Sequence, residues 1–136
     1  MSLRWLVLLV PLYSVNVPAL ELPIEIFEYV DNARVVAFVK ESDIDEAAEW
    51  KPDSGAPALS INKVVTIAND YAAGNEGMNG AIIEEIALRR IPHHEGKWHY
   101  MVKMKTETEE KVRYHYLVVL MNGRSIPAIR EPSSIK

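Results

Sequence analysis

Cysteine is absent from the 136 residues of the chain, and positive charge and long apolar runs are scarce. Without cysteine there is no disulfide bond and no thiol nucleophile, so stability has to come from a hydrophobic core. The net charge is −4 and no basic stripe is present, whereas phosphate binding needs one, so we expect no nucleic-acid partner. The longest apolar run is about half of the 20 residues that span a membrane, which predicts no stable span.

The N-terminal residues have the pattern of an export signal. Arg4 gives a positively charged start, an apolar run follows over residues 5–13, and Val17 and Ala19 place small side chains before a cleavage site. We therefore predict a signal peptide over residues 1–19, cleaved near Ala19, and a secreted or periplasmic protein. A buried N-terminal strand or helix is the alternative. Residues 20–136 suit one domain, and an exported chain without cysteine favours a bacterial envelope.

Residues 22–40 have the alternation of a β-hairpin with a turn at Asp31-Asn32, although residues 25–30 also fit a helical stripe. Residues 41–58 are acidic and then rich in proline and glycine, which predicts a loop with one helical turn near residues 45–49. Trp50 is the only large aromatic residue of this loop. We expect it to hold the loop against the core, and an exposed recognition anchor is the alternative.

An amphipathic helix is predicted from residue 61, with Ser60 as its N-cap and Gly74 as a left-handed stop. The apolar face of this helix recurs at a spacing of three and four residues. It consists of Ile61, Val64, Val65, Ala68, Tyr71 and Ala72.

The rest of the chain has the pattern of an antiparallel meander, with strands over residues 82–91, 97–106, 112–121 and 124–129. Asn122-Gly123 is a strong hairpin turn signal. Because one helix cannot bury its apolar face alone, the predicted fold is α+β, with one long helix across a sheet of four to six antiparallel strands. The sheet residues expected under the helix are Trp98, Tyr100, Tyr114, Tyr116 and Val118.

This order of elements resembles the PepSY domain, and with the preceding strand it is similar to a cystatin-like wrapped sheet. The residues that carry the resemblance are the helix after Leu59-Ser60, the strand Trp98-His99-Tyr100-Met101-Val102, and the strand and turn that end in Leu120-Met121-Asn122-Gly123. The resemblance covers residues 59–128. It implies an exported module that binds or restrains a peptidase or another envelope protein. Since no peptidase domain follows Lys136, we expect such binding to occur in trans.

Catalytic and metal-binding patterns are weak. His99 and His115 are predicted on the outward face of neighbouring strands, as solvated side chains or as a weak metal or pH-sensitive pair. No serine lies in a nucleophile elbow, and the paired acids Glu84-Glu85 and Glu109-Glu110 diverge on a strand. We therefore expect no enzyme and no cofactor. An enzyme that uses acids such as Asp43 is the least favoured hypothesis.

Two binding functions remain. The preferred one is a protein-binding module whose contacts are the turns at residues 92–96 and 107–110 or the exposed sheet edge. The candidate partner-binding residues are Trp50, His93, His94 and Glu95. The alternative is a small-ligand carrier with a pocket between helix and sheet, lined by Tyr71, Trp98, Tyr100 and Tyr116.

Overall fold

The computed structural model describes residues 10–14 and 22–132, apart from the side chain of Phe27. Most of the predicted signal peptide, with the cleavage site near Ala19, lies outside these residues, and export therefore stays a prediction. Among the residues described, no helix has the length and apolar character that crossing a membrane requires.

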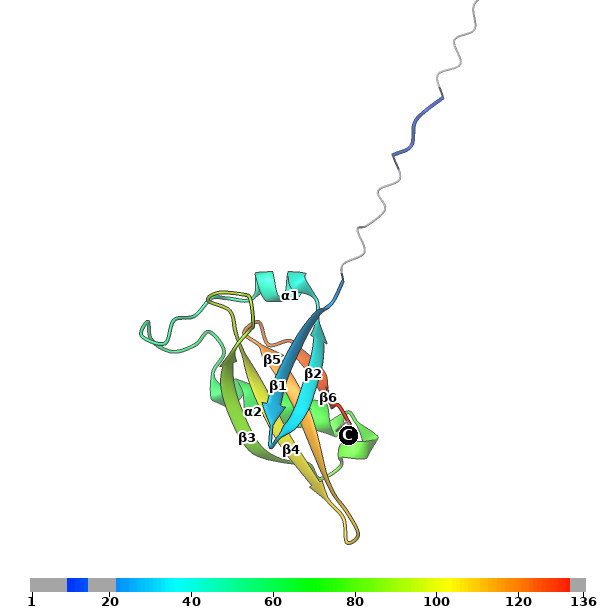
Figure 1. Cartoon of the computed structure of the whole chain (residues 1–136), viewed down its shortest axis with the longest axis vertical. Coiled ribbons are helices and arrows are strands. Elements are labelled where there is room, and N and C mark those ends of the chain that lie inside the picture. Colours follow the sequence, from blue (N-terminus) through cyan, green and yellow to red (C-terminus); the bar gives the residue numbers. More distant parts are fainter. Residues whose placement is uncertain (1–9, 15–21, 133–136) are drawn as a thin grey trace, which may run out of the picture.

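Six antiparallel strands form one sheet in the described part of the chain, in the order β1-β2-β6-β5-β4-β3 (Figure 1). This confirms the α+β class and the antiparallel arrangement, and it excludes the helical alternative for residues 25–30. The strands are β1 (Ile24–Val30), β2 (Ala33–Val39), β3 (Ile82–Arg90), β4 (Trp98–Glu107), β5 (Val112–Leu120) and β6 (Ser125–Arg130).

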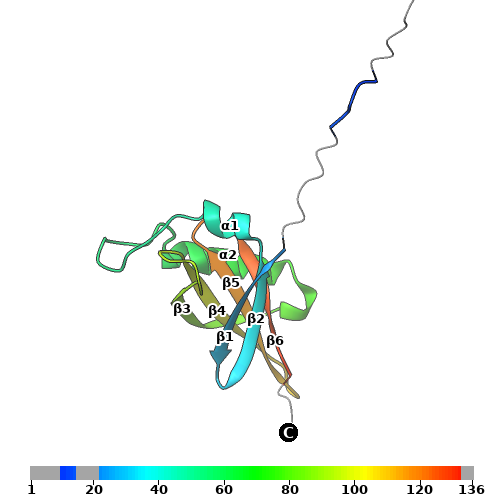
Figure 2. The ribbon, with the colours of Figure 1, turned by 45° about the horizontal axis from the view of Figure 1, so that its top comes forward.

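The β1–β2 hairpin folds over one face of the sheet. It is joined to β6 through only two residue pairs, Val35 with Arg130 and Val36 with Ile129, and Figure 2 shows it crossing in front of β4 and β5. Under the hairpin lies a core that includes Ile26 and Val35 from the hairpin and Val118 and Leu120 from β5. The sheet is therefore buried on both faces.

Helix α2 (Ile61–Ala73) covers the opposite face. Ser60 caps it, because its side chain accepts a hydrogen bond from the backbone N–H of Lys63, as predicted. Val64 and Ala68 are fully buried in a core with β4 and β5 residues. Gly74 ends the helix at φ −84°, so the predicted left-handed stop is wrong.

The predicted facing of β5 is also wrong. Leu117 and Val119 lie under α2, whereas Tyr116 and Val118 lie under the hairpin. Only Trp98 and Tyr100 of the sheet residues expected under the helix are in that core. Because β5 is a central strand with apolar residues on both faces, its alternation does not reveal which set meets the helix.

Two short helices complete the fold. α1 (Glu41–Glu46) begins about one turn before the helical turn predicted near residues 45–49. The connection after α2 contains the 3-10 helix η1 (Glu76–Met78), whose Met78 is buried.

Candidate functional site

Trp50 holds the long loop between α1 and α2 against the turn between β3 and β4. Its backbone N–H donates to the carbonyl of Gly96 at 3.0 Å, and its indole Nε1 donates to the carbonyl of Gly55 at 2.9 Å. The indole ring meets Trp98 edge-on, with ring centroids 5.0 Å apart. Trp50 therefore fixes the loop as expected, and its half-buried ring also lines a hollow on each side.

The first of these, called here the polar hollow, has a volume of about 660 Å³. It brings together the four candidate partner-binding residues, although Trp50 is more than 40 positions from the other three in the sequence. They come from the loop and from the β3–β4 turn. The lining residues are Trp50, Lys51, Pro52, Arg90, Ile91, Pro92, His93, His94, Glu95, Gly96 and Trp98.

Local backbone geometry shapes the polar hollow. His93 and Gly96 both have positive φ, 61° and 77°, so the turn coils tightly between the two strands. His94 is partly buried, with Nδ1 2.9 Å from the carbonyl of Pro92 and Nε2 3.9 Å from Glu41. His94 thus points back toward α1, and His93 and Glu95 are the exposed members of the turn.

Two cationic side chains, Arg90 and Lys51, line the polar hollow. The guanidinium of Arg90 lies 5.2 Å from the ring centroid of Trp98, in cation–π contact. No acidic side chain in the described part of the chain forms an ion pair with Arg90 or Lys51. Among the described residues, Glu95 is the one acid of the lining, and the carboxyl group of Glu49 lies within about 3.5 Å of the position that a Cβ on Gly96 would take. The hollow is therefore suited to an anionic group.

The second, called here the apolar hollow, has a volume of about 430 Å³ and lies between the loop, the start of α2 and β3. Ile86 and Leu88 of β3 form one wall, and Ile61 of α2 is 59% exposed beside them. The hydroxyl of Tyr100 donates to the carbonyl of Leu59 at 2.5 Å. Burial raises the pKa of Tyr100, which keeps this hydroxyl a neutral donor. The remaining lining residues are Trp50, Ala56, Pro57, Ser60 and Asn62.

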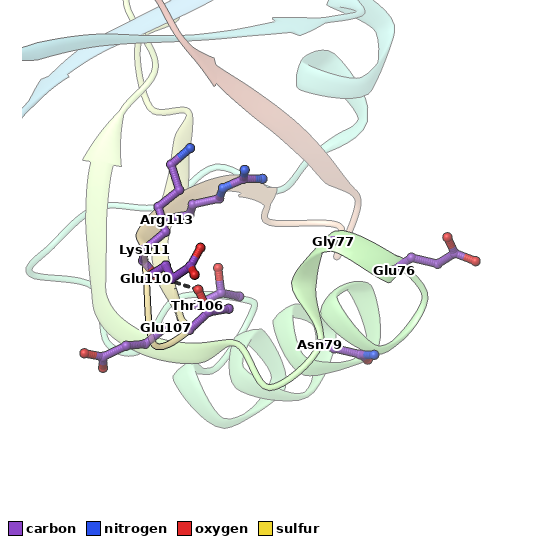
Figure 3. A pocket seen from close by; sticks show the side chains of 9 residues that line it. Glu76, Gly77, Asn79, Thr106, Glu107, Glu110, Lys111 and Arg113 are labelled. Atoms are coloured by element: carbon purple, nitrogen blue, oxygen red, sulfur yellow. Dashed lines mark hydrogen bonds between the residues drawn. The ribbon is translucent and has the colours of Figure 1, made fainter.

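A further hollow of about 620 Å³ lies between η1 and the β4–β5 turn, at residues 107–110. Figure 3 shows that the side chains of Glu76 and Glu107 point away from its centre. At its base Thr106 Oγ1 lies 2.9 Å from His115 Nε2. Burial, with a smaller effect of the positive charge of Arg113, lowers the pKa of His115. Because the carboxylates of Glu76 and Glu107 point away from this hollow, we favour the Trp50 end of the molecule.

The predicted pairing of His99 with His115 is wrong. His99 lies beside Leu120 on the hairpin side, and His115 lies beside Met104 on the helix side. The two histidines therefore cannot share an ion. His99 is also not solvated but completely buried, with Nε2 2.7 Å from Glu28. Sequence alternation missed this because the hairpin that covers His99 joins the sheet from a distant part of the chain.

The predicted small-ligand cavity is not formed by the four aromatic residues proposed for it. Tyr71, Trp98 and Tyr100 lie on the helix side of the sheet, but Tyr116 lies on the hairpin side. The sheet itself lies between them.

Comparison with known proteins returns nothing: no family model, curated protein or solved structure matches the chain. The similarity to PepSY domains therefore stays a prediction from the sequence.

Proposed function

We propose that the chain is an exported, non-enzymatic binding module of PepSY-like and cystatin-like architecture, and that it binds a partner protein at the Trp50 end of the molecule. The observation that carries the proposal is the position of Trp50 between a polar hollow with unpaired Arg90 and an apolar hollow with exposed Ile61. Tryptophan and arginine are the side chains most enriched among residues that dominate protein–protein binding energy.

The arrangement suits a protein surface. Trp50 is already fixed by two hydrogen bonds and by Trp98, so it loses little conformational freedom when a partner covers it. The apolar hollow supplies area to bury, and the charges of the polar hollow form a rim. The resemblance makes an exported peptidase, restrained in trans, the first class of partner to examine.

Binding can be tested with the purified mature protein and Trp50→Ala. Each is immobilised and exposed to envelope extract of the source cells, and the affinity of any captured protein is then measured after purification. We expect Trp50→Ala to weaken binding about tenfold or more, as for a central interface tryptophan. Tyr29→Ala is a suitable control, because Tyr29 is 66% exposed on β1. Equal binding by wild type and Trp50→Ala, with both folded by circular dichroism, would contradict the proposal.

A small-ligand carrier is the second candidate, and the apolar hollow favours it. Its volume of about 430 Å³ lies within the range of ligand pockets, roughly 300–1,000 Å³. A carrier would retain a small molecule during purification, which native mass spectrometry would detect. Ile61→Trp, which fills the mouth of the hollow, should then abolish retention. If native mass spectrometry gives only the mass of the unliganded protein, and capture of a partner protein depends on Trp50, the first candidate is supported and the carrier is excluded.

A further inference from the structure

β3 is an edge strand whose two halves differ. It pairs with β4 on one side, and the order of the described strands ends with it, so its other side presents backbone N–H and C=O groups (Figures 1 and 2). Its first half is irregular, with a bulge between Ile83 and Glu85, and Glu84 and Glu85 are exposed. Bulges and charges are devices that prevent a further strand from adding. From Ile86 to Arg90 the pairing is regular.

The regular half of β3 runs along both hollows. Ile86 and Leu88 line the apolar hollow, and Arg90, two residues further on the same face, lines the polar hollow. Side chains two residues apart on a strand are about 7 Å apart. On the other face Arg89 is already engaged, with its Nε 2.9 Å from Glu28. This edge therefore places the apolar side chain of Leu88 next to the positively charged side chain of Arg90, which forms no ion pair with the described residues.

We propose that residues 86–90 of β3 bind an extended segment of the partner protein by strand addition, and that this segment carries an acidic side chain two residues from an apolar one. The proposal rests on the proposed function and specifies its mode. The added strand forms backbone hydrogen bonds with the free side of β3, while alternate side chains enter the hollows. The apolar one contacts Leu88 and Ile61, and the acidic one pairs with Arg90, which the positive charge of Lys51 reinforces.

The test uses two synthetic peptides, acetyl-Thr-Val-Glu-Val-Leu-Val-Thr-amide and the same sequence reversed, because either strand direction preserves the spacing. Binding to the full mature protein is measured by calorimetry and by shifts of backbone amide resonances. We expect one peptide to bind and to shift residues of β3. Replacing its glutamate by lysine should weaken binding about tenfold.

N-methylation distinguishes strand pairing from burial of side chains alone. In a paired strand, alternate N–H groups point toward the neighbour. Two peptides are compared, one methylated on the Glu and Leu nitrogens and one on the nitrogens of the valines that flank Glu. Strand addition predicts that one methylation pattern abolishes binding, whereas the other changes the dissociation constant of the peptide by no more than about threefold.

Protein variants provide the matched half of the test. Arg90→Glu should reverse the preference, so that the lysine peptide binds better, while Arg113→Glu on β5 should leave the preference unchanged. Ile61→Ser should weaken binding several-fold, and Ile129→Ser, at 64% exposure on β6, should not.

Two results would overturn strand addition: failure of both peptides to bind at millimolar concentration, or equal effects of the two methylation patterns. If the protein still captures a partner in a Trp50-dependent way, the proposed function stands and only its mode is wrong. If the peptides bind at β3 but Trp50→Ala has no effect on capture, the proposed site has failed.

Discussion

The two faces of the sheet are buried by different means. On the helix side, α2 contributes only apolar side chains to the core, and the contact between helix and sheet ends at the apolar hollow beside β3. On the hairpin side, ion pairs surround the core. Glu28 contacts both Arg89 and His99, and Lys103 pairs with Asp31 at the hairpin turn, a hydrogen bond that raises the pKa of Lys103.

This difference separates the roles of the two faces. The hairpin has few backbone pairs with β6, so the charges of Glu28 and Asp31 help to fix where it docks. The N–O distances of Glu28 are short, but their angles are not those of hydrogen bonds, and Nδ1 of buried His99 has no hydrogen-bond partner among the residues that the structure describes. Buried charged groups of this kind fix where the hairpin docks more than they raise the free energy of unfolding. The hairpin side is thus bordered by charged contacts, whereas the margin of the helix side carries the apolar hollow.

The largest expected effect tests burial of both faces. Leu117 and Leu120 lie on opposite faces of β5 and are 1% and 0% exposed. Each change to alanine leaves a cavity, so we expect Leu117→Ala and Leu120→Ala each to lower the free energy of unfolding by about 3 kcal/mol. Urea denaturation measures both. A loss below about 0.5 kcal/mol for either variant would mean that its face is open to solvent.

The next effect isolates the buried charges. Glu28→Gln leaves Arg89 without its counter-charge and removes the carboxylate beside His99. Removal of one partner from a fully buried ion pair costs about 3–5 kcal/mol. Because Arg89 is 42% exposed and the contacts are poorly aligned, we expect about 2 kcal/mol in urea denaturation. Glu25→Gln is the control, since Glu25 forms an exposed pair with Arg34 and should change stability by less than about 1 kcal/mol. Similar losses for both variants would contradict a special role for Glu28.

Local patterns predicted the elements well because their causes are local. The spacing of apolar residues from Ile61 and the hydroxyl of Ser60 are sufficient to start α2, and alternation is sufficient to identify the strands after Gly80. The turn at Asp31-Asn32 has positive φ at both residues, as its sequence predicts.

Apart from the stop at Gly74, the errors concern which face each residue occupies, because that depends on contacts between distant segments. His99 is buried beneath the β1–β2 hairpin, where Glu28 lies about 70 residues earlier in the chain, and nothing near His99 in the sequence indicates this burial. At the candidate site, turn composition led to residues 93–95 and aromatic character led to Trp50. The hollows themselves, and the participation of Arg90 and Leu88, depend on how the loop meets the edge of β3.

A smaller effect concerns the join between the helix-side core and the loop. Tyr100→Phe removes the hydrogen bond to the carbonyl of Leu59 without creating a cavity, so we expect a loss of about 1 kcal/mol. The loop should open more often, which amide exchange at residues 51–59 would reveal. Unchanged exchange together with unchanged stability would show that Tyr100 does not anchor the loop.

The smallest effect is a pH dependence on the helix side. Burial, and then the charge of Arg113, lowers the pKa of His115 below 6.5, its value in the unfolded chain. As pH falls below about 6.5 the unfolded state therefore binds a proton more readily than the folded state, and the free energy of unfolding decreases until the folded pKa is passed. In His115→Gln the free energy of unfolding should therefore change less between pH 7.5 and pH 5 than it does in wild type. His93→Gln, at an exposed position, is the control and should keep the wild-type change. Identical pH profiles for wild type and His115→Gln would place the unfolded and folded pKa values of His115 together, and nuclear magnetic resonance titration of its ring would give the folded value directly.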